Sequence, residues 1–149
     1  MGQKINPSLF RLGFSAAWYS RWFTDGKKFS LFLEQDVKIR KYLEKKLRLS
    51  MIDRIDIERT TPTQMKIIVE TARPGVVIGR GGAGIEALRE EIFNKFIKDP
   101  KIKVEVVIRE VAQAALSAKI LAQTVALDIE KRVPFRRAMK NVIDQAKKA

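Results

Sequence analysis

The clearest candidate for chemistry in this sequence is a cluster of glycines in the stretch Val76–Gly84, which reads Val-Val-Ile-Gly-Arg-Gly-Gly-Ala-Gly. Within it, Gly79, Arg80, Gly81 and Gly82 form a G-x-x-G tetrad. Glycines allow positive φ angles and let the main chain approach a polyanion without a Cβ in the way. A helix expected directly after the tetrad would point free N–H groups and its positive dipole end at a phosphate. The tetrad is therefore a candidate phosphate-binding turn.

Two other phosphate-binding motifs fit these glycines less well. Gly79, Gly81 and Gly84 also match the dinucleotide pattern G-x-G-x-x-G. That fold needs several βαβ units in a parallel sheet, whereas here a hairpin pattern precedes the glycines and only one strand pattern follows. An ATP-type P-loop is excluded, because no Gly-Lys-Ser/Thr follows the glycines. A tight turn without a ligand stays open, although three glycines and an arginine exceed what a simple turn requires.

The amino-acid composition limits the class of binding partner and excludes several kinds of catalytic and metal-binding site. The 149 residues hold 30 Lys and Arg against 17 Asp and Glu, a net charge of +13. Such an excess favours a polyanionic partner, nucleic acid before an anionic membrane, although a basic surface kept for solubility is the alternative. The chain has no Cys and no His, so disulfides, thiolate or imidazole metal sites and Ser-His or Cys-His nucleophile pairs are absent. We expect no cofactor, no metal and no enzymatic activity; the carboxylates near the tetrad are interpreted as a solvated face.

The basic charge is concentrated at the two ends of the chain. Residues 1–50 hold 11 basic and 4 acidic residues, residues 51–100 hold 8 of each, and residues 101–149 hold 11 and 5. The tetrad thus lies in a middle third without net charge, and the surface that contacts nucleic acid is expected to extend over both ends of the chain. No apolar stretch reaches the roughly 18 residues of a membrane helix, and no signal-peptide pattern is present.

Residues 1–29 lack a sustained period and mix aromatic rings with cations, which suits an extended arm that stacks on RNA bases and pairs with phosphates. Packing of the tryptophans on the protein's own core is the alternative, and both can hold for different rings. The candidate RNA-contacting residues of this arm are Lys4, Arg11, Trp18, Arg21 and Trp22.

The middle of the chain predicts an α+β domain over residues 30–111. Apolar residues recur every fourth position in 31–49, which indicates a helix. Alternation on both sides of Thr61-Pro62-Thr63 predicts a β-hairpin, and Pro74 is suited to start a short helix that leads to the tetrad. A helical face follows until Asp99-Pro100, and a strand follows over 102–109. Helix, strand, strand, short helix, tetrad, helix and strand is the order of a type II KH domain, with a three-stranded sheet covered by helices.

Residues 112–149 predict two further helices, over 117–132 and 134–148. In the first, Leu121, Val125 and Ile129 are in register. In the second, apolar residues lie on one side, and Arg136, Arg137 and Lys140 form a basic ridge on another. A solvated charged face is the ordinary explanation of such a ridge.

Four separated motifs resemble, in order, the bacterial-type family of ribosomal protein three of the small subunit, whose members carry the type II KH domain and its nucleotide-clamping G-x-x-G turn. The motifs are the opening Met-Gly-Gln-Lys-Ile-Asn-Pro with Arg11-Leu12-Gly13-Phe14, the cluster Trp18-Tyr19-Ser20-Arg21-Trp22, the stretch Arg73–Gly82, and the stretch Arg132–Lys140.

The resemblance implies a structural RNA-binding protein of the small-subunit head, located in the cytoplasm or in an organelle. Its implied partners are ribosomal RNA, messenger RNA and ribosomal proteins ten and fourteen of that subunit, with no membrane. Arg136, Arg137 and Lys140 match family positions that face messenger RNA at the entrance of its channel, and Arg132 starts the same matching stretch. Family members continue into a sheet, so residues 112–149 are expected to be the helical start of an incomplete second domain. A free-standing KH module that acts as an RNA chaperone or assembly factor is the alternative function.

Overall fold

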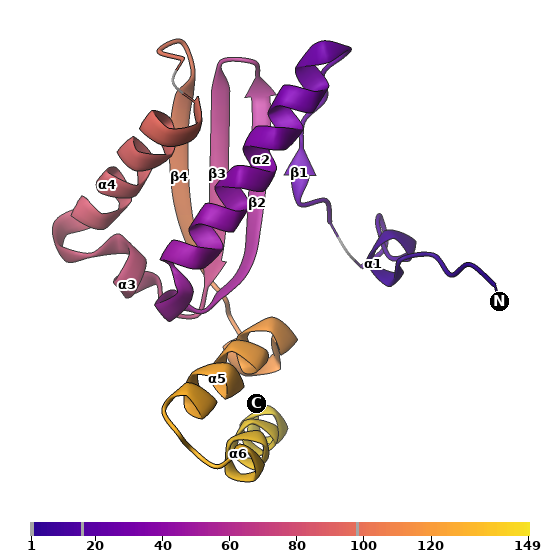
Figure 1. The fold of residues 1–149 in the computed structure, drawn as a ribbon, viewed down its shortest axis with the longest axis vertical. Helices are drawn as coiled ribbons and strands as arrows, with labels where there is room; N and C mark the ends of the chain where they lie inside the picture. The colour runs from indigo at the N-terminus through magenta and orange to yellow at the C-terminus, as the bar shows by residue number, and fades with distance from the viewer. Residues whose placement is uncertain (1, 16, 98) are drawn as a thin grey trace.

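The computed structural model describes residues 2–15, 17–97 and 99–149, and it confirms the predicted type II KH order (Figure 1). A four-residue helix, α1, precedes this domain at Pro7–Phe10. The elements of the domain are α2 (Lys27–Lys46), β2 (Ile52–Thr61), β3 (Gln64–Thr71), α3 (Pro74–Ile78), α4 (Ala83–Ile92) and β4 (Lys103–Glu110).

The sheet has four strands in the order β1-β2-β3-β4, where the sequence predicted three. The added strand is β1 (Ser20–Arg21), which lies within the predicted arm and pairs parallel to β2. Its pairing rests on a hydrogen bond from the N–H of Ile57 to the carbonyl of Tyr19. Two residues carry no alternation signal, so this strand could not be predicted. β2 and β3 form the expected antiparallel hairpin, and β4 pairs parallel to β3.

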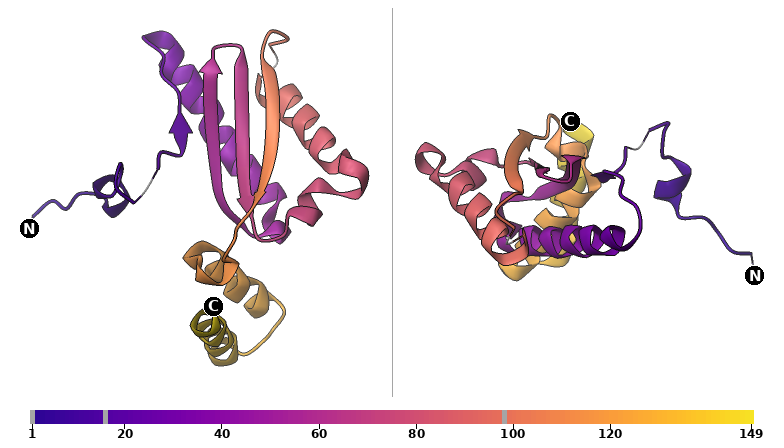
Figure 2. Two further views of the ribbon diagram at one scale, coloured as in Figure 1. Left: turned by 180° about the vertical axis from the view of Figure 1, so that it is seen from behind. Right: turned by 90° about the horizontal axis from the view of Figure 1, so that it is seen from above.

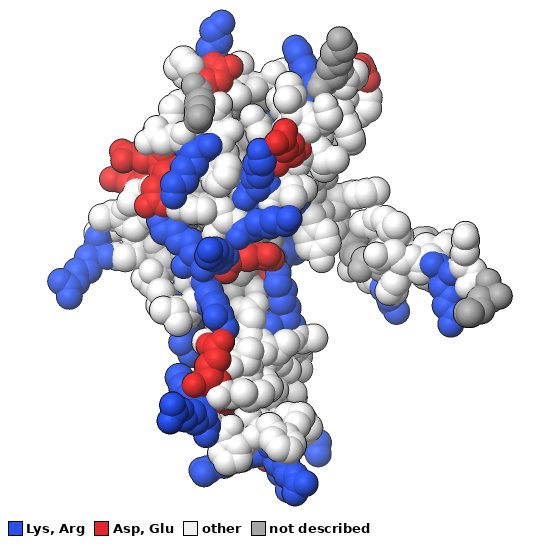
Figure 3. Space-filling view, viewed as in Figure 1, with Lys and Arg blue, Asp and Glu red and all other residues white. Residues whose placement is uncertain are grey.

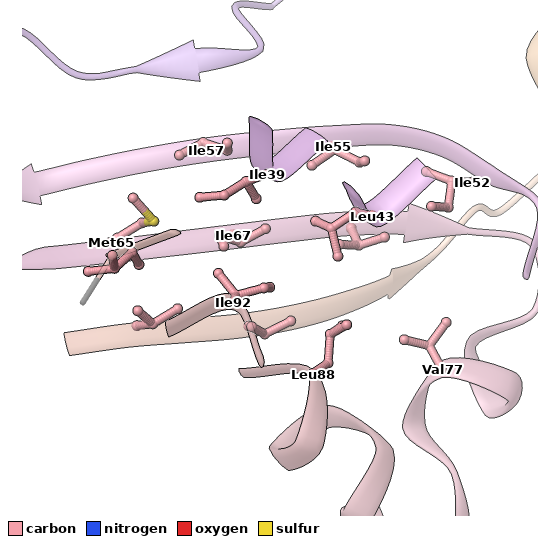
Figure 4. Close-up of a cluster of buried hydrophobic side chains, with 14 residues drawn as sticks. Ile39, Leu43, Ile52, Ile55, Ile57, Met65, Ile67, Val77, Leu88 and Ile92 are labelled. Atoms are coloured by element: carbon pink, nitrogen blue, oxygen red, sulfur yellow. The ribbon is translucent and has the colours of Figure 1, made fainter. Parts of the chain in front are cut away.

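The core fills the space between one face of the sheet and the helices α2, α3 and α4 (Figure 4). Ile39 and Leu43 of α2 and Leu88 and Ile92 of α4 meet the alternate apolar residues of the strands, including Ile57 and Ile67. Figure 2 shows the opposite face of the sheet without a covering helix. Since successive strand residues point to opposite faces, this packing fixes which residues reach solvent on the open face.

Helix α2 runs from Lys27 to Lys46, four residues earlier at its start and three at its end than the predicted span 31–49. Gly26, with φ at 62°, turns the chain into the helix, so the helix begins where that turn ends. Leu47, the last apolar residue of the predicted period, becomes the C-cap. At the end of α4 the helix widens into a π-turn over Phe93–Ile97.

The C-terminal residues form α5 (Ala118–Glu130) and α6 (Phe135–Lys148), which lie beyond one end of the sheet (Figure 1). The hydroxyl of Ser117 caps α5 by accepting a hydrogen bond from the N–H of Ile120. Within the described part of the chain, no helix is long and apolar enough to cross a membrane.

The predicted apolar faces of these two helices were partly wrong. Ile120, outside the predicted register, is the buried residue of α5, whereas Ile129 is exposed. In α6, Ala138 and Val142 are buried, but Phe135 and Met139, predicted on the same side, are exposed. The helices pack mainly on each other, so each buries only a narrow stripe.

Candidate nucleic-acid interface

The tetrad forms a tight turn between α3 and α4, at the edge of the domain opposite the N-terminal arm (Figure 1). Gly79, Gly81 and Gly82 all have positive φ, at 69°, 62° and 83°. A residue with a Cβ would be strained at each of these positions, so the turn requires its glycines. Gly79, Arg80 and Gly81 are exposed.

Helix α4 begins directly after this turn, and its N-cap residue provides no side-chain acceptor for the first backbone N–H groups. Its N-cap is Gly82, which has no side-chain cap, and the N–H of Ala83, the first amide of the helix, donates to the carbonyl of Arg80. Arg80 forms no ion pair within the described residues. Glu86, in the first turn, is the nearby negative group. The turn therefore combines a helix start that no side chain caps with one cation that has no ion pair among the described residues, and such groups bind a phosphate.

Gly84 has a different role from the tetrad. A Cβ built on it would lie 2.5 Å from the carbonyl oxygen of Val77 and 2.9 Å from that of Ile78. These contacts are impossible, so Gly84 is required by the close approach of α3 and α4. The G-x-G-x-x-G match thus combines turn glycines with a packing glycine, and the surrounding sheet contains no βαβ series of the dinucleotide fold.

A groove of about 340 Å³ lies at the other end of α4, between that helix and the edge strand β4. Its lining includes Arg89, Lys101 and Lys103, together with Phe93 and a single carboxylate, Glu90. Helix α4 thus connects the tetrad at its N-terminus to a second basic region at its C-terminus. Ten helical residues rise about 15 Å, a length that a few nucleotides of a single strand can follow.

The open face of the sheet, in contrast, balances its own charges. One row across the four strands pairs Arg21 with Glu58, Glu58 with Lys66, and Lys66 with Glu105. Nitrogen–oxygen distances are 3.1 Å for Arg21–Glu58 and 3.8 Å for Lys66–Glu105. Cross-strand neighbours of opposite charge attract one another and leave little net field for an RNA strand. This face is therefore a poor candidate for RNA binding.

Two arginines of the domain hold the arm where it joins the sheet. Nη2 of Arg54 donates hydrogen bonds to the carbonyls of Ala17 and Trp18, at 2.8 and 3.0 Å. Nη2 of Arg40 donates to the carbonyl of Tyr19 at 2.8 Å. Partial burial lowers the pKa of Arg54, but the hydrogen bond and charge of Asp56 raise it above its usual value overall. Both guanidinium groups therefore bind the chain's own backbone.

Asp36 anchors the next residues of the arm. It is completely buried on α2, and its Oδ2 accepts hydrogen bonds from the indole Nε1 of Trp22 at 2.7 Å and from the hydroxyl of Ser20 at 3.0 Å. Its Oδ1 accepts from Nη2 of Arg59 at 2.9 Å. The guanidinium of Arg59 lies 4.3 Å from the ring of Phe32. One carboxylate thus joins the arm, α2 and β2.

These contacts divide the predicted arm into two parts. In the part near the sheet, the side chains of Trp22 and Arg21 already have partners within the protein. Less of each side chain is therefore available to RNA, and their RNA-contacting role stays a prediction. Lys4, Arg11 and Trp18 are exposed, although the carbonyl of Trp18 is held by Arg54. The distal segment, residues 2–15, extends away from the body (Figures 1 and 2). No ion pair involves Lys4 or Arg11 within the described residues.

The ridge of α6 is exposed and unpaired. Arg136, Arg137 and Lys140 are all exposed, and none has an ion pair within the parts of the chain that the structure describes. They line a shallow groove together with Asp144. On the face shown in Figure 3, basic groups gather over the lower end of α2 and over α5 and α6. The ridge is part of this larger basic region.

Arg132 connects α5 to the ridge through its backbone. Its φ is 64°, an unusual value for a residue other than glycine. The N–H of Val133 donates to the carbonyl of Asp128 at 3.0 Å, and the N–H of Arg132 donates to that of Ile129 at 2.9 Å, which closes α5 in the manner of a Schellman turn. A glycine would suit this position better, so the arginine is retained at a conformational cost.

A polar cluster fastens α2 to α4. Glu91 accepts hydrogen bonds from Nζ of Lys46 and from the hydroxyl of Tyr42, and Nζ of Lys95 lies 4.5 Å from the Tyr42 ring. The hydrogen bond from Lys46, followed by that from Tyr42, holds the pKa of Glu91 below its usual value. No group of three potential metal-binding side chains occurs among the described residues.

Sequence reasoning missed the anchoring residues Arg40, Arg54, Arg59 and Asp36. A signal existed for Asp36, because it lies three residues before Ile39 on the buried stripe of α2. A carboxylate on such a stripe indicates a buried partner. The arginines gave no comparable signal, since a basic chain makes every arginine resemble an RNA contact.

Comparison with known proteins agrees with this architecture. The KH domain family matches residues 38–134. The chain is 44% identical over 152 residues to the small ribosomal subunit protein uS3 of Oenococcus oeni, in an alignment that covers 100% of the chain and 57% of that protein. It is 43% identical to uS3 of Leuconostoc mesenteroides, covering 98% of the chain and 67% of the relative, and 45% identical to uS3 of Coxiella burnetii, covering 96% and 61%. The chain thus spans about three fifths of the length of the curated relatives it matches.

The fold and the tetrad turn define a KH-domain protein. The chain belongs to the KH domain family and, within it, to the family of the small ribosomal subunit protein uS3.

Proposed function

We propose that the chain is a structural RNA-binding component of the small ribosomal subunit, without a catalytic step. The observation that carries this proposal is the turn of Gly79–Gly82, which presents positive-φ glycines and a helix start that no side chain caps beside the unpaired Arg80. The relatives named above as small-subunit ribosomal proteins support it. The bound RNA would be a single-stranded or looped segment of ribosomal RNA, whose backbone the turn can clamp.

The basic regions lie too far apart to serve one short RNA. The tetrad lies at one edge of the domain, the distal arm at the other, and α6 beyond the end of the sheet (Figures 1 and 2). We infer that several RNA segments are bound at once, as in a protein that is embedded in a ribonucleoprotein particle. Cytoplasmic ribosomes would then be its place of action, with an organellar ribosome as the other possibility.

The ridge is proposed to face messenger RNA. Arg136, Arg137 and Lys140 follow one side of α6 and are free of internal acceptors in the described structure, so they can track successive phosphates. Cations at the entrance of the messenger channel would favour separated strands held along the protein over a closed duplex. Ribosomal proteins ten and fourteen of the small subunit are the proposed protein neighbours.

The tetrad is tested by reversing charge in the turn. We expect the variants Arg80→Asp and Gly81→Asp to weaken binding of a single-stranded ribosomal RNA segment at fixed salt. Arg80→Asp should leave α3 and α4 folded, whereas Gly81→Asp also strains the turn, where φ is 62°. Arg109→Asp is the matched control, because it makes the same charge change as Arg80→Asp on the open face of the sheet. Parental affinity of both turn variants, or an equal loss in Arg109→Asp, would refute the phosphate clamp.

The ridge is tested in translation. Ribosomes that carry Arg136→Ala, Arg137→Ala and Lys140→Ala together should assemble normally, since alanine keeps the helix and these side chains are exposed. They should slow on messages with a stable hairpin but not on unstructured ones. Equal slowing on both messages, or on neither, would refute the messenger contact. Gradient sedimentation of cell extract adds a further check, because a mostly free pool would favour an RNA chaperone.

A further inference from the structure

The groove between the distal arm and the anchored segment has the composition of a base-binding site. It encloses about 410 Å³, within the size range of small-ligand pockets. Leu9 and Leu12 of the distal arm form one wall, and Trp18, Tyr19 and Arg54 form the other. Apolar and aromatic side chains predominate, so the site suits a flat, partly apolar group.

The wall formed by Tyr19 and Arg54 is held in place. The guanidinium of Arg54 lies 4.5 Å from the centroid of the Tyr19 ring, while its Nε donates to Asp56 at 2.6 Å and its Nη2 holds the arm carbonyls. The main chain of Tyr19 is fixed from the other side by Arg40 and Ile57. Trp18, by contrast, leaves 60% of its surface exposed beside this fixed pair. A pre-ordered wall lowers the entropy cost of binding.

Charge distinguishes this groove from others on the molecule. No Asp or Glu is among its lining residues, all of which belong to the described part of the chain. The grooves at α4–β4, at α2–α5 and on α6 each include a carboxylate: Glu90, Glu44 and Asp144 respectively. Here Arg11, which has no ion pair among the described residues, lines the groove instead, so the occupant should carry negative charge next to its flat group. A nucleobase with its attached phosphate meets both requirements.

We propose that this groove binds one unpaired nucleobase of RNA, stacked on Trp18, with the adjoining phosphate near Arg11. This inference rests on the proposed RNA-binding function and assigns it a second, separate site. Unstacked bases are recognised in this way by aromatic rings and arginine planes. The anchoring contacts of the segment Ala17–Trp22 would then serve to present the groove at a fixed place relative to the tetrad.

The test measures affinity of the full chain for a short single-stranded RNA and for the same RNA with abasic nucleotides. We expect Trp18→Ala to lower affinity for the normal RNA about tenfold, a typical value for loss of one stacking contact. Its salt dependence should stay parental, since no charge is removed. Trp18→Phe should recover most of the loss, and Phe23→Ala, which removes an aromatic ring that is 85% exposed and outside the groove, should bind as the parent does.

Abasic RNA separates base binding from other roles of the groove. On this RNA, parent and Trp18→Ala should bind equally. A loss that persists on abasic RNA, a loss of the same size in Phe23→Ala, or parental affinity of Trp18→Ala would overturn the proposal. The variant Arg80→Asp in the same assay reports on the proposed function: if it weakens binding while Trp18→Ala does not, only the base-binding groove is refuted, whereas parental binding by Arg80→Asp refutes the phosphate clamp itself.

Discussion

Basic residues gather at the base of the N-terminal arm and on the ridge of α6, but they differ in what they contact. Around the segment Ala17–Trp22, Arg40 and Arg54 donate to backbone carbonyls and Arg59 pairs with Asp36. On α6, Arg136 and Arg137 have no ion pair within the described residues. Arginine side chains thus stabilise the fold at the base of the arm, whereas on α6 they remain available to bind RNA.

This difference changes what net charge means for RNA binding. Counterion release depends on cations that meet phosphates, so an arginine with an internal acceptor adds little to it. Within the N-terminal 50 residues, Arg21 and Arg40 have internal acceptors, so the excess of positive charge there overstates the RNA-contacting surface. Among the C-terminal residues, Arg136, Arg137 and Lys140 have no ion pair in the described structure.

The largest effect should come from Asp36→Asn, which leaves the buried Arg59 without its counter-charge. Removing one partner of a buried pair costs about 3–5 kcal/mol of unfolding free energy. Urea denaturation measures the loss. Glu34→Gln is the matched control, because the same helix places Glu34 in an exposed pair with Lys38 at 2.5 Å, and it should cost less than about 0.5 kcal/mol.

A small loss for Asp36→Asn would contradict the anchoring role of this carboxylate. If Asp36→Asn does not fold, the double variant Asp36→Asn with Arg59→Met is measured instead. It removes both charges, keeps an amide oxygen as acceptor for Trp22 and Ser20, and should recover a folded protein.

A smaller and opposite effect is expected at Arg132, where the ridge meets the end of α5. Arg132→Gly should raise the unfolding free energy by about 0.5–1 kcal/mol, because glycine adopts the positive φ of 64° without strain. Arg132→Ala keeps the strain and should leave stability within about 0.5 kcal/mol of the parent. If Arg132→Gly is no more stable than Arg132→Ala, the positive φ of Arg132 does not lower the stability of the protein.

The smallest effect is the pH dependence carried by Glu91. Its pKa lies below the usual value of 4.5 in the folded state, so its contribution to stability is complete above that value and is lost as the pH falls through the lowered pKa. Thermal melting of the parent and of Glu91→Gln should therefore differ at neutral pH and converge at low pH. A difference that is the same at neutral and acidic pH would contradict the role of the carboxylate charge.

The fold was largely predictable from the sequence because its signals are local. Alternation predicted β2, β3 and β4, Pro74 marked the start of α3, and the glycines marked the turn. The short strand β1 and the anchoring of the arm depend on contacts with Arg40, Arg54 and Asp36, which are distant in sequence. Periodicity carries no information about such contacts, so the sequence left open which aromatic rings of the arm pack on the protein itself.

The candidate site, too, was predictable from the sequence only where its signals are local. The tetrad was identified from residue type and spacing, since positive φ and the absence of a Cβ are properties of glycine itself. Whether Arg21 or Arg136 is free for RNA could not be predicted, because both lie in similar basic sequence. Only the positions of Asp56 and Glu58 beside Arg21 distinguish them.

The most direct test compares the salt dependence of RNA binding after matched removal of charge. One variant replaces the ridge residues Arg136, Arg137 and Lys140 by alanine, and the control replaces three basic residues that already have an ion pair within the described structure, Arg21, Lys38 and Lys66. Each removes the same charge, but only the first removes cations that can meet phosphates. The slope of log affinity against log salt should fall by about 2 for the ridge variant, at roughly 0.7 per phosphate contact on single strands, and by less than about 0.7 for the control. Equal slopes for the two variants, or a greater fall in the control, would contradict the division between cations that hold the fold and cations that bind RNA.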